Sequence, residues 1–326
     1  MPFLLGMDIG GSRSVAAVAD ETGRIVGVGR AGGANYQEVG TKRAAREIRS
    51  AMEQALDRTG AISGTVVAAA YGVAGADRDV DFEAVRALLD PLSPVPTYTL
   101  VNDTIIALRA GTDDGLGVCC VGGNGANCIG RNRFGITKKV GGLGPISGDS
   151  GSAGAIVSAA VTAALWGREG RGPETALYGR LTTELGLQSL DDFVQFGYYD
   201  RGHAVDLGRL VLVVFDVAAA GDAVALELLR AQGRGVARAA LCAIRALFGK
   251  DDEVAVILAG SVLGHQPSGA LFEACAAELQ AGHGRTRLKR LEVEPAIGAL
   301  LLARDGQVGA ADAAFAARVR SRWPAW

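Results

Sequence analysis

An acidic residue followed by a short glycine-rich segment is the first pattern in this sequence that could carry chemistry. Asp8 is followed by Gly10-Gly11-Ser12-Arg13, with apolar runs on both sides. Two apolar runs joined by such a bend predict a β-hairpin. Glycines let a backbone approach a phosphate closely, turn amides can bind an anion, and a carboxylate can hold Mg²⁺ through water. The segment therefore indicates either a phosphate-binding turn or a tight hairpin with an isolated acid.

The elements that would position these residues alternate between short apolar runs and amphipathic stretches, as in α/β proteins. A second glycine-rich bend, Gly122–Ala126, follows a predicted strand at Leu116–Val121, and Arg30–Gly40 is predicted to be rich in turns. The other predicted strands are Thr65–Val73, Thr97–Val101, Glu253–Leu258 and Arg287–Glu292, and the predicted helices are Thr41–Thr59, Asp81–Leu89, Ile105–Ala110, several between Ala153 and Leu247, and Pro295–Trp326. Asp103 or Thr104 could cap the helix at Ile105–Ala110.

Length and composition exclude several classes of protein. The 326 residues suggest two domains with a soft division near Gly111–Gly115, and 49% hydrophobic with 21% charged residues argues against disorder. A net charge of −2 argues against nucleic-acid binding. We expect no signal peptide and no membrane segment. Five cysteines without metal-type spacing favour a reducing, cytoplasmic environment.

Five separated motifs in order carry a family resemblance. The chain resembles the sugar kinase, Hsp70 and actin superfamily, and within it is similar to N-acetylglucosamine kinases and the BadF/BcrA-type ATPase family. The motifs are Asp8–Ser14, Gly33–Gly40 (GANYQEVG), Val101–Ala110 (VNDTIIALRA), Gly122–Asp149 and Leu258–Leu263 (LAGSVL), joined by GGLGPISGDSGSAGAI at Gly141–Ile156 and PAIGALLLA at Pro295–Ala303.

The resemblance implies an α/β fold of two actin-like (ribonuclease H-like) domains, each a mixed sheet with flanking helices, around an interdomain cleft. The expected domains are 1–114 and 115–305, with a C-terminal helix at about 306–326 packing back on the first. The implied activity is ATP-dependent phosphorylation of an amino sugar or N-acetylhexosamine, with O6 of N-acetylglucosamine as the specific expectation. Similar proteins are often dimers, so a homodimer acting on a small-molecule sugar is expected.

The resemblance also assigns roles to residues. Asp103, after a strand, is the expected catalytic carboxylate, because phosphoryl transfer needs a group that accepts the acceptor hydroxyl's hydrogen bond. ATP is expected to contact Gly10, Gly11, Ser12, Arg13, Asn124, Gly125, Gly260 and Ser261, with Asp8 positioning Mg²⁺ through water. The sugar is expected to contact Asn35, Asp77, Asn127, Gly142 and Asp149, whose amides, carboxylates and backbone suit sugar hydroxyls.

Four positions depart from the family pattern. The second phosphate loop has Asn124 where Thr is usual and Ala126 where Ser is usual, so Ala126 offers no side-chain donor. Leu143 and Ser150 replace a frequent Trp and Glu, which removes an aromatic platform for the sugar.

Two alternative functions stay open at this point. One is a non-catalytic sugar sensor on a kinase scaffold, which the altered loop and the missing Trp would suit. The other is a BadF-type ATPase that activates a dehydratase through an iron–sulfur cluster between subunits, although none of the five cysteines lies in a convincing glycine-rich context.

Overall fold

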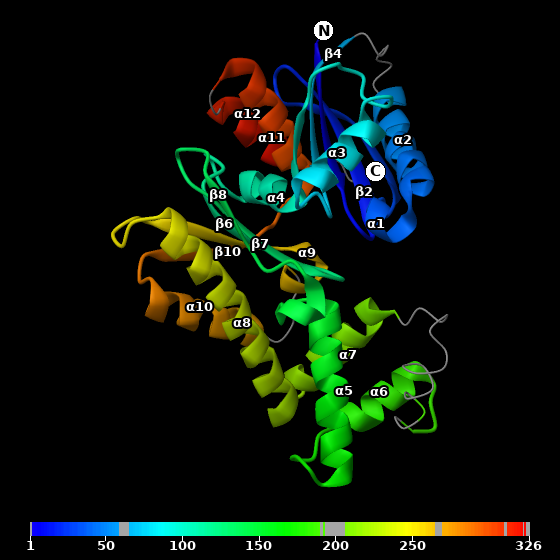
Figure 1. Cartoon of the computed structure of the whole chain (residues 1–326), viewed down its shortest axis with the longest axis vertical. Helices are drawn as coiled ribbons and strands as arrows, with labels where there is room; N and C mark the ends of the chain where they lie inside the picture. Colours follow the sequence, from blue (N-terminus) through cyan, green and yellow to red (C-terminus); the bar gives the residue numbers. More distant parts are fainter. Residues whose placement is uncertain are drawn as a thin grey trace. The chain divides into compact units, whose positions relative to one another are not determined.

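The computed structural model describes residues 2–58, 65–189, 192, 206–264, 269–309, 312–321 and 323. The pattern of contacts divides the chain into two units (Figure 1). Unit 1 comprises Met1–Cys119, Arg131–Gly135 and Lys289–Trp326, and unit 2 comprises Cys120–Gly130 and Ile136–Leu288. The domain limits expected at residues 114 and 305 stay predictions, and each unit is described by itself.

Unit 1 is built on a five-stranded sheet of order β3-β2-β1-β4-β5. Its strands are β1 (Phe3–Ile9), β2 (Arg13–Asp20), β3 (Ile25–Gly32), β4 (Val66–Val73) and β5 (Thr99–Asn102). β1 pairs antiparallel with β2 and parallel with β4, so the sheet is mixed. Its helices are α1 (Tyr36–Val39), α2 (Thr41–Asp57), α3 (Asp79–Leu89), α4 (Asp103–Gly111), α11 (Pro295–Val308) and α12 (Ala313–Ser321).

The two faces of β1 have different neighbours, because successive side chains of a strand point to opposite sides. Leu5, Met7 and Ile9 belong to the buried apolar cluster that includes residues of α2 and α3. Gly6 lies on the other face, where a Cβ would come within 2.4 Å of the Leu300 nitrogen of α11. Asp8 has the same parity as Gly6, so β1 directs its carboxylate to the α11 side of the sheet.

α4 and α11 cross at a glycine. A Cβ on Gly298 would come within 1.8 Å of the carbonyl oxygen of Ile106, so the two backbones meet with no room for a side chain. This close approach fixes the starts of both helices relative to the sheet of unit 1.

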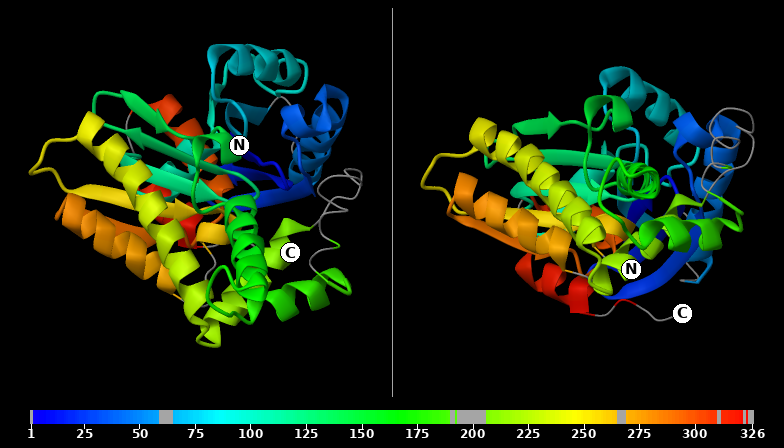
Figure 2. Two further views of the ribbon diagram at one scale, coloured as in Figure 1. Left: turned by 60° about the horizontal axis from the view of Figure 1, so that its bottom comes forward. Right: turned by 90° about the horizontal axis from the view of Figure 1, so that it is seen from below.

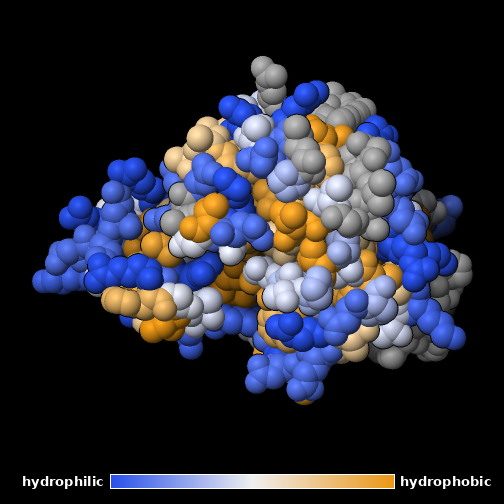
Figure 3. Space-filling view, turned by 90° about the horizontal axis from the view of Figure 1, so that it is seen from above, coloured by the Kyte–Doolittle hydropathy of each residue, from blue (hydrophilic) through white to orange (hydrophobic). Residues whose placement is uncertain are grey.

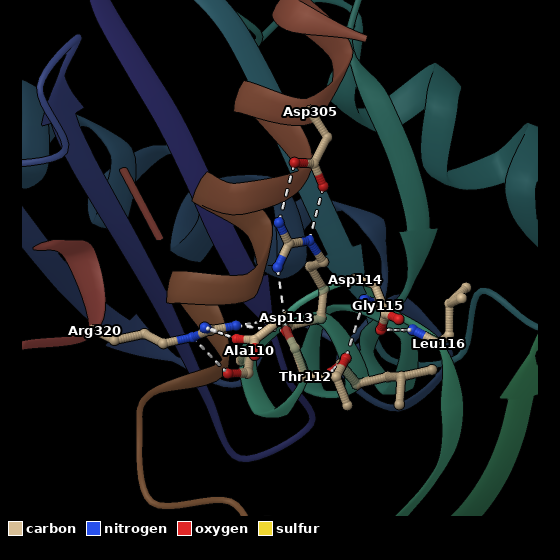
Figure 4. A network of polar contacts seen from close by, with 10 residues as sticks. Ala110, Thr112, Asp113, Asp114, Gly115, Leu116, Asp305 and Arg320 are labelled. Carbon is tan, nitrogen blue, oxygen red and sulfur yellow. Dashed lines mark hydrogen bonds and ion pairs between the residues drawn. The ribbon is translucent and has the colours of Figure 1, made fainter. Parts of the chain in front are cut away.

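A polar network holds the end of α4 (Figure 4). Arg109 is buried and donates to both carboxylate oxygens of Asp305, at 2.7 and 3.1 Å, and to the carbonyl of Thr112. Arg320 of α12 donates to the carbonyls of Arg109, Ala110 and Thr112 and pairs with Asp113 at 2.7 Å. These contacts satisfy carbonyls that have no partner within a helix. The segment predicted to be a soft division is therefore pinned at its start by α11 and α12.

A second five-stranded sheet, of order β10-β9-β6-β7-β8, belongs mostly to unit 2, although the ends of β6, β7 and β10 fall within the limits of unit 1. Its strands are β6 (Gly117–Gly122), β7 (Ala126–Arg131), β8 (Thr137–Val140), β9 (Val254–Ala259) and β10 (Thr286–Arg290). Its helices are α5 (Ala153–Glu169), α6 (Leu177–Leu185), α7 (Leu207–Ala219), α8 (Ala223–Leu247), α9 (Gly260–Leu263) and α10 (Ala270–Gly282), with a 3₁₀ turn, η2, at Gly144–Ser147. α8 and α10 run side by side (Figure 2) and touch where a Cβ on Gly233 would come within 2.2 Å of the Leu271 carbonyl.

The predicted fold class is confirmed: the chain forms two mixed five-stranded sheets with flanking helices. Two local predictions are wrong. Arg30–Gly40 was predicted to be rich in turns, but Arg30–Gly32 belongs to strand β3 and Tyr36–Val39 forms α1. The residue that caps α4 is Asn102, not Asp103 or Thr104. Thr59, the last residue of the helix predicted from Thr41, and residues 310, 311, 322 and 324–326 of the predicted C-terminal helix lie outside the described residues.

Apolar residues concentrate in the interior of each unit, where buried valines, leucines, isoleucines and alanines line both sheets. On the face drawn in Figure 3, hydrophobic residues lie in separate groups among hydrophilic ones. Within the part of the chain that the structure describes, no helix combines the length and the apolar character needed to cross a bilayer.

Candidate active site

The turn between β1 and β2 is a glycine-dependent bend that presents Ser12 and Arg13 to solvent. The Gly10 nitrogen donates to the Arg13 carbonyl at 3.0 Å, and the Ala34 nitrogen donates to the Gly10 carbonyl at 2.9 Å. A Cβ on Gly33 would come within 1.8 Å of the Gly11 carbonyl oxygen. The chain after β3 therefore packs directly under the turn and holds it in place.

Three carboxylates and one guanidinium gather on the α11 side of β1. Arg13 and Glu294 form an ion pair of 2.8 Å. Burial, together with the charges of Asp103 and Glu294, raises the pKa of Asp8 to about 7, although the nearby Arg13 opposes the shift. Glu294 was not among the site residues predicted from the sequence. No local signal could have found it, because its partner lies 281 positions away.

This constellation suits a divalent cation with a polyphosphate. The acids outnumber the nearby cationic group, and the pKa of Asp8 is raised first by its burial and then by the charges of Asp103 and Glu294. Among the described residues, no three His, Cys, Asp or Glu side chains are arranged to ligate a metal ion directly. The expectation that Asp8 positions Mg²⁺ through water, an ion that usually keeps several of its waters, stays a prediction.

Asp103 is the first residue of α4, and its carboxylate is not needed as the helix cap. The Asn102 side chain accepts from the Thr104 nitrogen at 2.9 Å and donates to Asp77 at 3.0 Å and to the Ala76 carbonyl at 3.3 Å. Asn102 thus caps α4 and ties the loop after β4 to it. Asp103 is half-buried and close enough to Asp8 to affect its pKa.

Asn35 and Asp77 lie in two loops of unit 1 that Asp81 joins. Asn35 is buried, accepts from the Gln37 nitrogen at 3.2 Å and donates to Glu38 at 3.1 Å. The Asp81 carboxylate accepts from the Tyr36 hydroxyl at 2.9 Å, from the Gln37 amide at 3.1 Å, and from the Arg78 guanidinium and backbone. The pKa of Asp81 lies well below its usual range, chiefly because of the hydrogen bond from Arg78. Asp81 was not among the residues predicted from the sequence to belong to the site.

The second glycine-rich turn in unit 2 packs against the segment after β9. The Gly123 nitrogen donates to the Gly125 carbonyl at 2.9 Å, and the Gly123 carbonyl accepts from Ala153 at 2.8 Å. Gly260 has φ of 89°, and a Cβ there would come within 2.4 Å of the Gly122 carbonyl oxygen. The structure thus brings the Asn124–Gly125 turn and the Gly260–Ser261 segment together, as a nucleotide subsite would require.

A cavity of about 190 Å³ in unit 2 collects the other predicted sugar residues. Asn127, Gly142 and Asp149 line it, with Cys128 at its wall. The Asp149 carboxylate accepts from the backbone nitrogens of Leu143 at 2.9 Å and Gly144 at 2.7 Å, so it shapes the loop after β8. Leu143 is 72% exposed and gives no aromatic surface to the cavity.

Comparison with known proteins places the chain in a family. The model of the BadF/BadG/BcrA/BcrD ATPase family matches residues 5–303. An N-acetylmuramic acid/N-acetylglucosamine kinase of Clostridium acetobutylicum is 26% identical over 93% of this chain and 99% of its own length. An N-acetyl-D-glucosamine kinase of Dictyostelium discoideum is 26% identical over 92% and 97%. A Chromobacterium violaceum structure, described as a candidate N-acetylglucosamine kinase, has TM-score 0.71 at 21% identity and covers 93% and 99%.

The chain therefore belongs to the BadF/BadG/BcrA/BcrD ATPase family. The predicted family is confirmed, and membership of an ATPase family implies the use of ATP. The relatives' names agree with the predicted kinase activity. The roles of individual residues stay predictions.

Replacing Asp8 with Asn should stabilise the unliganded protein at pH 8. The folded pKa of Asp8 is about 7 and its ordinary value is 3.8, so the folded state binds the proton more tightly. Wild-type stability should then fall as pH rises from about 4 to about 7 and stay level above that. We expect Asp8→Asn to remove this fall, a gain on the order of 4 kcal/mol at pH 8 and little at pH 4.

Urea unfolding of both proteins at pH 4, 6 and 8 measures this effect, with the exposed Asp79→Asn as the control. Mg·ATP should stabilise the wild type more than Asp8→Asn. An Asp8→Asn protein that is less stable than wild type at pH 8 would contradict the prediction.

Proposed function

We propose that the protein is an ATP-dependent kinase that transfers the γ-phosphoryl group to the 6-hydroxyl of N-acetylglucosamine or a closely related amino sugar. The observation that supports this most directly is the match to two named amino-sugar kinases over at least 92% of this chain and 97% of theirs. The carboxylates around Asp8 and the two glycine-dependent turns are what phosphoryl transfer needs from a protein.

In the proposed reaction, Asp103 accepts a hydrogen bond from the acceptor hydroxyl and takes its proton as the new P–O bond forms. The bond between the γ-phosphorus and the β–γ bridging oxygen breaks, and ADP leaves. Arg13 and the amides of the Gly10–Ser12 turn bind phosphate oxygens, and Asp8 orders the water around the ion. Mg²⁺, when bound, neutralises charge on the triphosphate. Gly260 and Ser261 are proposed to contact the nucleoside.

The proposed sugar contacts are Asn35, Asp77, Asn127, Gly142 and Asp149. Amides and carboxylates discriminate strongly against a sugar that lacks a matching hydroxyl or acetamido group. The cavity beside Asn127 and Asp149 supports a small polar acceptor of this kind.

ADP release should be measured with ATP, Mg²⁺ and a panel of N-acetylglucosamine, N-acetylmuramic acid, glucosamine and glucose. We expect turnover with N-acetylated amino sugars, and NMR of the product should place the phosphate on O6. Tight sugar binding without ADP release would favour the sugar-sensor alternative, for which Ala126 and the exposed Leu143 are the supporting features. The homodimer and the cytoplasmic location stay predictions, and light scattering tests the first.

A further inference from the structure

Glu294 stands immediately before α11 but does not serve that helix. It occupies the N-cap position, yet its side chain makes no capping hydrogen bond to the helix. Its carboxylate accepts from Arg13 Nη2 at 2.8 Å instead. Glu294 lies beside the N-terminus of the 14-residue helix α11, yet its side chain binds Arg13, at the end of the glycine-rich turn Gly10–Arg13.

The exposure of the two partners is unequal. The Glu294 side chain is 21% exposed and the Arg13 side chain 58% exposed. A guanidinium carries five N–H donors in a rigid fork, and within the described residues the bond to Glu294 is the one hydrogen bond seen for the Arg13 side chain. The Glu294 carboxylate is therefore the more buried partner, while most of the Arg13 guanidinium remains exposed to solvent.

We propose that Glu294 is a positioning residue, which holds the Arg13 guanidinium in place for the triphosphate of ATP. This inference rests on the proposed nucleotide site. A free arginine loses considerable rotational freedom when it binds an anion, and a prior partner removes part of that cost. Arg13 directly follows the turn Gly10–Ser12. The orientation of its side chain therefore determines whether the guanidinium N–H groups point in the same direction as the backbone N–H groups of that turn.

The Arg13–Glu294 ion pair differs from an ordinary surface salt bridge because Asp8 and Asp103 lie near it. Glu294 acts on Asp8 strongly enough to affect its pKa, and Asp103 acts on the same carboxyl. Glu294 therefore lies within the charged constellation rather than on a remote edge. Partly exposed ion pairs add little to folding stability, so a role limited to stability would have a small effect.

The test is a double-mutant cycle on nucleotide affinity. Wild type, Glu294→Gln, Arg13→Gln and the double variant are titrated calorimetrically with Mg²⁺ and a non-hydrolysable ATP analogue. We expect Glu294→Gln to raise Kd about 10-fold, and to have no further effect in the Arg13→Gln background. Glu292→Gln, an exposed neighbour two positions earlier, is the matched control and should bind like wild type.

Melting temperatures separate positioning from folding. All four proteins should melt within a few degrees of each other, since the pair is partly exposed. Glu294→Asp keeps the charge on a shorter side chain and should bind with intermediate affinity, which keeps the test valid should Glu294→Gln fold poorly. In turnover assays the loss should appear in KM for ATP more than in kcat.

Unchanged affinity in Glu294→Gln, or an effect that adds fully to that of Arg13→Gln, would overturn the inference. A large drop in melting temperature with unchanged affinity would show a merely structural pair and overturn it too. Failure of the proposed function looks different: the wild type would bind the analogue and show the coupling, but would phosphorylate no sugar in the panel.

Discussion

Asp103→Asn should lower kcat by about 10²–10⁴-fold, the usual range for losing a general acid–base group, while Mg·ATP still binds. Asparagine keeps the size of the side chain and can still contact a hydroxyl, but it cannot take the proton as the new bond forms. The measurement is ADP release under saturating ATP and sugar, together with calorimetric binding of an ATP analogue.

Two features of the structure make this experiment interpretable. Asn102 caps the helix, so the Asp103 carboxylate is not required for its start and the melting temperature should change little. Asp79→Asn makes the same substitution at the first residue of another helix, α3, and serves as the matched control. Turnover near the wild-type rate in Asp103→Asn would rule out the assignment of this residue as the base.

Gly298→Ala should destabilise the protein by about 3 kcal/mol or more, at the upper end of the cost of overpacking. The added methyl would lie 1.8 Å from the Ile106 carbonyl oxygen, which is backbone of α4 and cannot rotate away. The helices must then separate, and the starts of α4 and α11, which carry Asp103 and Glu294, must shift. Activity should therefore fall together with stability.

The same helix offers the matched control. Gly306 also lies within α11, but the nearest atom to a Cβ there is the Thr99 hydroxyl oxygen at 3.9 Å. Gly306→Ala should be neutral or stabilise the protein by up to about 1 kcal/mol, because alanine favours a helix over glycine. Denaturant unfolding of both variants measures the contrast. Equal stabilities for the two would show that α4 and α11 do not meet as closely as described.

The sequence by itself determined the local features. Both glycine-rich bends, the strands beside them and the long amphipathic helix from Thr41 follow from residue types at short spacing, since hairpin turns and helix periodicity are decided by near neighbours. The family follows from five separated motifs in order along the chain. Only the tertiary structure decided the rest. β3 carries glycines that weaken a strand signal, yet Gly29 is needed because a Cβ there would come within 1.9 Å of the Ala51 carbonyl.

Long-range partners decided the candidate site as well. The sequence offered Asp103 or Thr104 as the cap of α4, but Asn102 caps it, and its amide also reaches the loop that contains Asp77. In the sequence, nothing distinguishes Glu294 from other charged residues. The packing of α11 against α4 places it beside Arg13, with which it forms an ion pair. The physical reason is the same in both cases: residue type and periodicity report local conformation, whereas the approach of distant backbones determines which carboxylates share one electrostatic field.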